Sequence, residues 1–424
     1  MTPGARLAAA IEVLGEIFAR SAAADRALTA WGRAHRFAGS KDRAAIGERV
    51  YLVLRRLNEC AYRMGGERRP RALVLGSLSV GDGMDVKAID ALCSDGAHAP
   101  GALTDDERAA LRSVPTPTAE PWKRLNYPEW LHPELIAALG DRLESEMAAL
   151  NLRAPLDLRV NSLKAKRADV LVDLQHGGIE ATPCRYAPLG LRVAAGADAK
   201  IANLDVYLSG RVEIQDEASQ LAVMLAGAKP GETVIDLAAG AGGKSLGLAA
   251  AMEDRGRIVA CDIDPMRLAT LAQRAARAGA TIIETGGDPY TLQGEAGGAD
   301  LVFVDAPCSG SGTWRRNPEA KWTLTPAKLE TYRAAQARLL DRAADLCSPR
   351  GRILYATCSW LPGEGPDQVA RFVERHRQWM VRPASYAWYA ALAGRAPSGV
   401  GGFALLTPGQ DETDGFFVAI LGRG

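Results

Sequence analysis

Two cysteines in the second half of the chain stand where each could do chemistry. Cys308 follows the acidic Asp305 in the stretch DAPCSGSG, and Cys358 stands just past the apolar run of GRILYATCSW. Free cysteine is normally buried as a small apolar residue, so a thiol on a turn of Pro, Ser and Gly is poorly explained by packing. A thiolate is a nucleophile, and its pKa must fall from about 8.5 toward neutrality for it to react. The pair therefore predicts covalent catalysis.

A loop of small residues forms the second candidate site. In VIDLAAGAGGKS, residues 234–245, an apolar run ends in Asp236, the loop follows, and Lys244 leads into a segment rich in Ala and Leu. A strand, a glycine loop and a helix in that order are typical of a site for a nucleotide-like ligand. The loop also fits a relaxed phosphate-binding loop, with Ala238 in place of the first glycine and Asp305 as the acid that would hold magnesium. The loop alone leaves a methyl donor and a nucleoside triphosphate open.

Two further acids follow the next apolar runs. Asp262 comes 20 residues after Gly242 in RIVACDIDP, a spacing at which a carboxylate can accept hydrogen bonds from ribose hydroxyls. Asp264 precedes a proline and is expected to cap the next helix, which leaves Asp262 for a ligand. Asp288 follows two glycines and could accept the amine of an adenine or simply form a turn. A phosphate-loop enzyme has no need of Asp262, so this acid favours the methyl donor.

The two thiols suit methylation of a pyrimidine at C5. This carbon is too poor a nucleophile to take a methyl group directly, but a thiolate that adds to C6 makes C5 reactive toward a sulfonium methyl. A second group must then remove the C5 proton so that the base is released by elimination. The target base must also leave its stack to reach the pocket.

The elements that would position these residues alternate from residue 216 onward. Strands are expected at 233–237, 257–262, 281–285, 300–305 and 351–357, with helices at about 245–253, 265–278, 326–347 and 366–377. This alternation predicts a parallel, doubly wound sheet in which the first, fourth and fifth strands are neighbours, so that Cys308 and Cys358 face one crevice. The runs at 403–406 and 416–421 should pair as an antiparallel edge hairpin. Five parallel strands plus a terminal antiparallel hairpin make the Rossmann-like fold of class I S-adenosylmethionine methyltransferases.

The whole chain of 424 residues is long enough for more than one domain. We expect an all-helical domain at 1–113, an extended proline-rich linker at 114–134, a small α/β RNA-recognition subdomain at 135–215, and the catalytic domain at 216–424. Between Arg6 and Arg71 the sequence holds 14 Lys and Arg against 7 Asp and Glu. This excess fits either a solvated surface or a nucleic-acid contact.

Seven scattered cysteines suggest neither disulfides nor a metal site. Their number is odd and no CxxC pair occurs, so we expect no bound metal and a reducing compartment, the cytoplasm. The N-terminal segment is too charged for a signal peptide or membrane span. We expect a monomer with no membrane partner.

With these motifs the chain resembles a known family, the RNA cytosine-C5 methyltransferases of the RsmB/NOP2/NSUN type, and in particular its bacterial ribosomal RNA branch. The resemblance covers about residues 120–424, and residues 1–113 resemble the NusB-like RNA-binding domain of the bacterial members. The motifs that carry it are PEWL at 128–131, LRVNSL at 158–163, IQDEASQ at 214–220, DAPCSGSG at 305–312, ATCSW at 356–360 and DGFF at 414–417.

The resemblance implies a role for each candidate residue. It makes Cys358 the nucleophile and Cys308 the residue that assists product release. DNA cytosine methyltransferases use a cysteine of a PC motif as nucleophile, so Cys308 remains the alternative. The resemblance also implies that Asp305 and Lys244 touch the cytosine. The residues implied to bind S-adenosylmethionine are Ala238, Ala239, Gly240, Ala241, Gly242, Gly243, Lys244, Asp262, Asp288 and Asp305.

The chain departs from the family in this loop. The usual Cys-Ala-Ala-Pro-Gly-Gly-Lys is Ala-Ala-Gly-Ala-Gly-Gly-Lys here, with changes at Ala238, Gly240 and Ala241. The extra glycine and the missing proline should loosen the loop and weaken affinity without changing the ligand.

The resemblance implies small-subunit ribosomal RNA as substrate. The alternatives are transfer RNA or another RNA as substrate, a phosphate-loop nucleoside triphosphatase, and a non-catalytic RNA-binding protein that keeps the fold.

Overall fold

The computed structural model describes residues 1–94, 96–113, 120–194, 201–392, 396–397 and 399–424. It divides into two compact units. The first holds Met1–Arg153 and Thr313–Thr325, and the second holds Ala154–Gly312 and Pro326–Gly424.

The first unit is helical, as the periodic apolar residues of its first part predict. Its described helices are α1 (Pro3–Arg20), α2 (Ala24–Ala34), α3 (Ser40–Arg55), α4 (Leu57–Arg63), α5 (Pro70–Asp82), α6 (Val86–Cys93), α7 (Asp105–Arg112), α8 (Pro121–Arg124), η1 (Glu129–Leu131), α9 (His132–Leu139), η2 (Gly140–Arg142), α10 (Leu143–Leu150) and α17 (Pro318–Thr323). Leu14, Ile17, Val50, Leu54 and Leu75 are fully buried in one hydrophobic cluster. Helical spacing places these side chains on the inner faces of α1, α3 and α5.

The proline-rich segment is not wholly extended, which corrects our prediction. Residues 114–119 lie outside the described part of the chain, but α8 and η1 form within the remainder. Pro121 occupies the first turn of α8. Proline is tolerated at that position because its missing N–H would have no partner inside the helix anyway.

The second unit contains a small antiparallel sheet with the strand order β2-β3-β1-β4. The strands are β1 (Leu156–Val160), β2 (Ala181–Pro183), β3 (Gly190–Val193) and β4 (Val212–Ile214), accompanied by α11 (Arg167–His176) and α13 (Asp205–Leu208). Leu158, Val160 and Leu191 of the sheet pack with Val170 and Leu174 of α11. The sheet therefore has its own small core.

The larger sheet of the second unit has the order β10-β12-β9-β8-β5-β6-β7, and β11 pairs with β12. The strands are β5 (Thr233–Asp236), β6 (Arg257–Cys261), β7 (Ile283–Gly287), β8 (Ala299–Asp305), β9 (Cys347–Thr357), β10 (Trp379–Arg382), β11 (Ala404–Leu406) and β12 (Phe416–Arg423). The pairs among β5 to β9 are parallel, and β12 runs antiparallel to β9. The predicted fold class is confirmed, and β9, β8 and β5 are successive neighbours.

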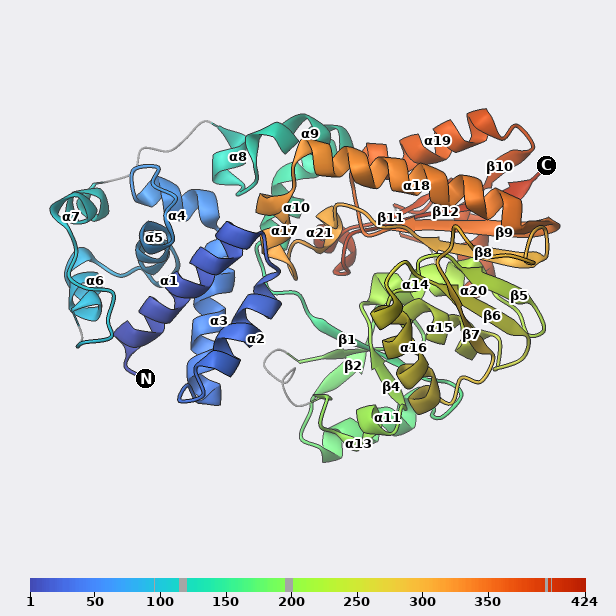
Figure 1. Ribbon diagram of the computed structural model, residues 1–424, viewed down its shortest axis with the longest axis horizontal. Helices are drawn as coiled ribbons and strands as arrows, with labels where there is room; N and C mark the ends of the chain where they lie inside the picture. Colours follow the sequence, from blue (N-terminus) through green and yellow to red (C-terminus); the bar gives the residue numbers. More distant parts are fainter. Residues whose placement is uncertain (95, 114–119, 195–200, 393–395, 398) are drawn as a thin grey trace. The chain divides into compact units, whose positions relative to one another are not determined.

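Helices cover both faces of this sheet (Figure 1). One hydrophobic cluster packs α14 (Glu217–Ala226), α15 (Gly243–Ala251), α16 (Pro265–Ala278) and α20 (Ala384–Ala391) on one face. A second cluster packs α18 (Pro326–Leu346) and α19 (Pro366–Arg375) on the other. The remaining short helices are η3 (Ser311–Thr313), η4 (Pro362–Glu364) and α21 (Pro408–Asp411).

The C-terminal hairpin differs from our prediction in its place. β11 and β12 do pair antiparallel, but β12 lies between β9 and β10 and is not an edge strand. The sequence interpretation missed β10, whose four residues WMVR give no clear alternation. Seven of the eight residues of β12 are buried, as a strand flanked on both sides requires.

Candidate active site

The two cysteines meet at the carboxyl ends of β8 and β9. Sγ of Cys308 lies 3.4 Å from Sγ of Cys358, and both side chains are half-buried. The loops that carry them are joined by the main chain, because Gly312 N–H donates to the Cys358 carbonyl at 3.0 Å. The predicted convergence is therefore present, and both thiols are free.

An ion pair stands beside the thiols. Nζ of Lys244, in the first turn of α15, lies 2.6 Å from Oδ2 of Asp305 at the end of β8. The same ammonium is 5.2 Å from the ring centroid of Phe416. Burial would lower the pKa of Lys244, but the neighbouring Asp305 carboxylate outweighs it and the pKa is raised. The lysine therefore stays charged at the crevice.

The glycine loop makes the tight turn that its residues suggested. Gly240 and Gly242 adopt positive φ angles of 55° and 84°. A Cβ on Gly242 would lie 2.5 Å from Cγ of Leu271, so only glycine fits there, whereas Gly240 faces open space. The Ala241 carbonyl accepts a hydrogen bond of 2.6 Å from Arg274. This contact stabilises the loop at the position where the usual proline is absent.

Asp262, after β6, lies near the glycine loop, whereas Asp288, after β7, closes a turn. Asp262 is nearly buried, and its Oδ2 accepts from the Gly240 N–H at 2.9 Å. Asp264 caps α16 by accepting from the Met266 N–H, as predicted. Asp288 is exposed, and its Oδ1 accepts from the Tyr290 N–H at 2.9 Å, the geometry of a turn.

Comparison with known proteins identifies the family. A sequence model described as 16S rRNA methyltransferase RsmB/F matches residues 222–422. A probable ribosomal RNA small subunit methyltransferase B from Synechocystis is 33% identical over 304 residues, which cover 70% of this chain and 67% of that protein. The chain belongs to the RsmB/F family of methyltransferases.

Further similarities agree with the RsmB/F assignment. A probable ribosomal RNA small subunit methyltransferase B from Bacillus subtilis is 30% identical over 76% of this chain and 72% of its own length. The crystal structure of a methyltransferase homolog protein from Pyrococcus horikoshii superimposes with a TM-score of 0.60 at 25% identity, over 72% of this chain and 97% of that one. The ferredoxin-like domain of the family matches residues 127–200.

Membership in the RsmB/F family identifies the cofactor. These proteins are S-adenosylmethionine-dependent methyltransferases, so the chain uses a methyl donor and the nucleoside triphosphate alternative is set aside. The residues present fit this donor. Gly240 leaves open space above the loop, and α15 begins at Gly243 so that its first N–H groups face the loop.

Asp236 is a polar residue of the site for which the sequence suggested no role. It is fully buried at the end of β5, and its Oδ2 accepts from the Ser245 hydroxyl at 2.7 Å. Burial raises its pKa to about 7. The sequence did contain a signal for this contact. Asp236 ends an apolar strand, and a serine follows nine residues later in the first turn of a helix.

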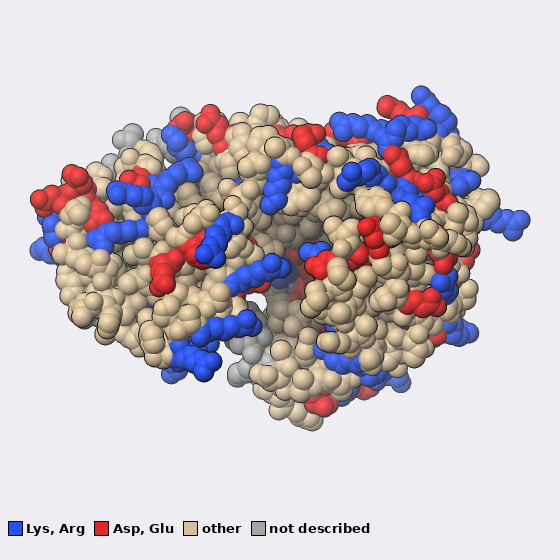
Figure 2. Space-filling view, viewed as in Figure 1, with Lys and Arg blue, Asp and Glu red and all other residues tan. Residues whose placement is uncertain are grey.

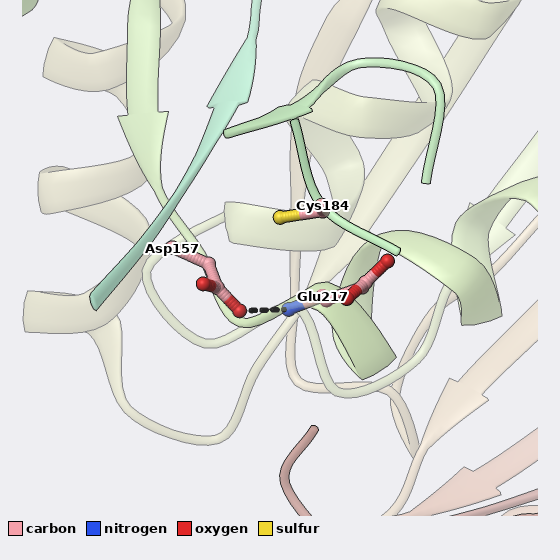
Figure 3. Close-up of side chains that lie close together, drawn as sticks. All are labelled: Asp157, Cys184 and Glu217. Carbon is pink, nitrogen blue, oxygen red and sulfur yellow. Dashed lines mark hydrogen bonds between the residues drawn. The ribbon is translucent and has the colours of Figure 1, made fainter. Parts of the chain in front are cut away.

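A separate buried cluster of Asp157, Cys184 and Glu217 offers three possible metal-ligand atoms within 4.8 Å of one another (Figure 3). The Arg192 guanidinium already supplies a positive charge to the two carboxylates of this cluster. It bonds to both oxygens of Asp157 at 2.8 and 3.0 Å and lies 3.6 Å from Glu217. The cluster joins the small sheet to the start of α14.

Among the described helices, none is long and apolar enough to cross a membrane.

Proposed function

We propose that the protein transfers the methyl group of S-adenosylmethionine to C5 of a cytosine in small-subunit ribosomal RNA, with Cys358 as nucleophile and Cys308 assisting release. The observation that carries this proposal is the Sγ–Sγ distance of 3.4 Å beside the Lys244–Asp305 ion pair. Two thiols in contact suit a reaction in which a covalent bond to the base must form and then break.

The surroundings of Cys308 favour this division of roles. Its hydrogen bond with Cys358, its burial and the negative charges nearby hold the pKa of Cys308 well above its usual value. A thiol that keeps its proton can donate it toward the sulfur of Cys358. Cys358 is then the sulfur that attacks.

The proposed reaction uses the crevice residues in order. Sγ of Cys358 forms a bond to C6, and the electron pair displaced to C5 takes the methyl group. The C5 proton then passes to the sulfur of Cys308, whose own proton passes to the sulfur of Cys358 as the bond between C6 and that sulfur breaks. The electron pair of the C5–H bond restores the double bond between C5 and C6. Asp305 can accept from the cytosine amine, as carboxylates do, while Lys244 fixes its orientation.

The donor would be held by the loop Ala238–Lys244, with Asp262 and Asp288 at the ends of the next two strands. When bound, it supplies a sulfonium methyl group. Asp262 stands next to the loop through its bond to Gly240, which suits a carboxylate that receives ribose hydroxyls.

Exposed cations of the first unit, among the Lys and Arg side chains that the space-filling view draws in blue (Figure 2), support an RNA partner. Several arginines of the N-terminal excess are neutralised, as in the ion pairs Arg20–Glu16 and Arg71–Glu107. Arg33, Arg36 and Lys41 are exposed and form no ion pair with any residue that the structure describes. They flank Phe37, whose side chain is 72% exposed. Basic groups interleaved with an exposed aromatic ring are typical of single-strand RNA contacts.

The test uses labelled S-adenosylmethionine and ribosomal RNA. Transfer of label to cytosine is expected for the native protein, and Cys358→Ala should abolish it. Cys308→Ala should trap a protein–RNA adduct that survives denaturation and migrates as a shifted band. An adduct with Cys358→Ala in place of Cys308→Ala would reverse the two roles.

The substrate needs its own experiment. Bisulfite sequencing of cellular RNA with and without the gene should show one or more small-subunit ribosomal cytosines that lose methylation. Loss confined to transfer RNA would instead support the alternative substrate. We also propose that the protein acts as a cytoplasmic monomer, which sedimentation and fractionation would test.

A further inference from the structure

Glu364 lies between the two loops that carry the cysteines. It is the last residue of η4, and its side chain is fully buried. Oε1 accepts from the Ser309 N–H at 2.8 Å, and Oε2 accepts from the Ser359 hydroxyl at 2.6 Å. Ser309 follows Cys308 and Ser359 follows Cys358. One carboxylate thus bonds to the neighbour of each thiol.

Further contacts make this arrangement rigid. The Ser309 hydroxyl also donates to Oε2 of Glu364 and lies 3.2 Å from the Ser359 hydroxyl. Gln336 of α18 donates to Oε1 at 3.1 Å and to the Pro307 carbonyl at 2.9 Å. The loop of Cys308 is therefore fixed from both sides of the thiol.

The Glu364 side chain bonds to uncharged groups. Among the residues that the structure describes, no Lys, Arg or His forms an ion pair with it. Its partners are neutral donors: two serines, a glutamine and one main-chain N–H. Burying a carboxylate without a cation is unfavourable, so packing alone gives no reason for an acid here.

We propose that Glu364 is a positioning residue for both cysteines, holding their loops so that the sulfurs meet and reserving the role of nucleophile for Cys358. This inference rests on the proposed function. Hydrogen bonds to both loops set the geometry. The negative charge adds to the hydrogen bond with Cys358 and to burial in raising the pKa of Cys308.

The other groups around the thiols are few. Tyr332 of α18 and Tyr355 of β9 interact electrostatically with Cys308, and burial raises the pKa of both phenols, so they stay neutral near pH 7. Lys244, paired with Asp305, acts on Cys358. Glu364 is the carboxylate that contributes to the raised pKa of Cys308.

The first test is Glu364→Gln, which keeps the size of the side chain and removes its charge. The rate at which iodoacetamide alkylates Cys308 is followed by mass spectrometry between about pH 8 and 11. The midpoint should move to lower pH, so that the reaction at a fixed pH below the midpoint becomes several-fold faster. Glu374→Gln, an exposed site on α19, is the matched control and should not move it. An unchanged midpoint in Glu364→Gln would overturn the electrostatic role.

The second test is Ser359→Ala, which keeps the charge and removes one of the bonds to the loop of Cys358. Methyl transfer should fall at least about tenfold, because misplacing a reacting group by about 1 Å can cost a hundredfold. Donor affinity by calorimetry should stay unchanged. Native transfer rates in Ser359→Ala would refute the geometric role.

These tests separate the two proposals. Alkylation needs neither RNA nor methyl transfer, so its outcome stands even if the substrate or reaction is different. The adduct experiments with the cysteine variants do not involve Glu364. If Glu364→Gln failed to fold, Ser359→Ala would still decide whether the bond between the loops matters.

Discussion

Replacing Asp236 by asparagine should change how the stability of the second unit depends on pH. Asp236 is fully buried, and burial together with the nearby Asp305 raises its pKa from 3.8 to about 7. Between pH 4 and pH 7 the folded protein keeps a proton that the unfolded chain has released. Stability therefore falls as pH rises through this window and is level above it. A shift of about 3 units at about 1.4 kcal/mol each gives a loss of about 4 kcal/mol.

Asparagine cannot ionise, so Asp236→Asn should lack this loss. Native-state hydrogen exchange at the amides of β5 is a suitable assay, because it reports the opening of this sheet even in a chain of two units. Asp264→Asn is the matched control, since it removes an exposed charge and asparagine caps helices as well as aspartate does. Parallel pH curves for the native protein and Asp236→Asn would refute the reasoning.

Three other predictions concern cations. Lys244→Met should lower methyl transfer at saturating donor at least about tenfold in a single-turnover assay, because its carboxylate partner loses a charged hydrogen bond. Arg33→Gln with Arg36→Gln should reduce the salt slope of RNA binding by about 0.7 per lost phosphate contact in fluorescence titrations, while Arg20→Gln, already in an ion pair, should not. Burial lowers the pKa of Lys321 from 10.5 to about 7, so Lys321→Met should stabilise the helical unit against urea. The gain should be about 5 kcal/mol below pH 7 and shrink toward pH 10.

Long elements with strong local signals could be predicted from the sequence. The helix expected at 265–278 is α16 itself, because Asp264 caps it, Pro265 opens it and Gly279 ends it in a left-handed conformation. Four of the five parallel strands were predicted within two residues of their ends, whereas β9 begins at Cys347, four residues before the predicted start. Continuous apolar runs are what a strand covered on both faces requires.

Elements without local signals could not be predicted. β10 has four residues and exists because β12 offers it hydrogen bonds. Glu364 stands in the stretch LPGEGP, where a turn at the surface is the natural expectation. Its burial depends on Ser309 and Gln336, which are 55 and 28 positions away in the chain. No periodicity reports contacts of that kind.

The sequence around the two thiols likewise does not show which one is the nucleophile, because the charged residues that act on them are far away in the chain. Both cysteines follow a strand and both precede a serine, so their local sequences leave either as the nucleophile. The Lys244 ammonium interacts with Cys358, whereas Cys308 faces the Glu364 carboxylate. An anion opposes the ionisation of a nearby thiol. The raised pKa of Cys308 thus supports the proposal that Cys308 keeps its proton and that Cys358, the thiol in contact with it, is the sulfur that attacks.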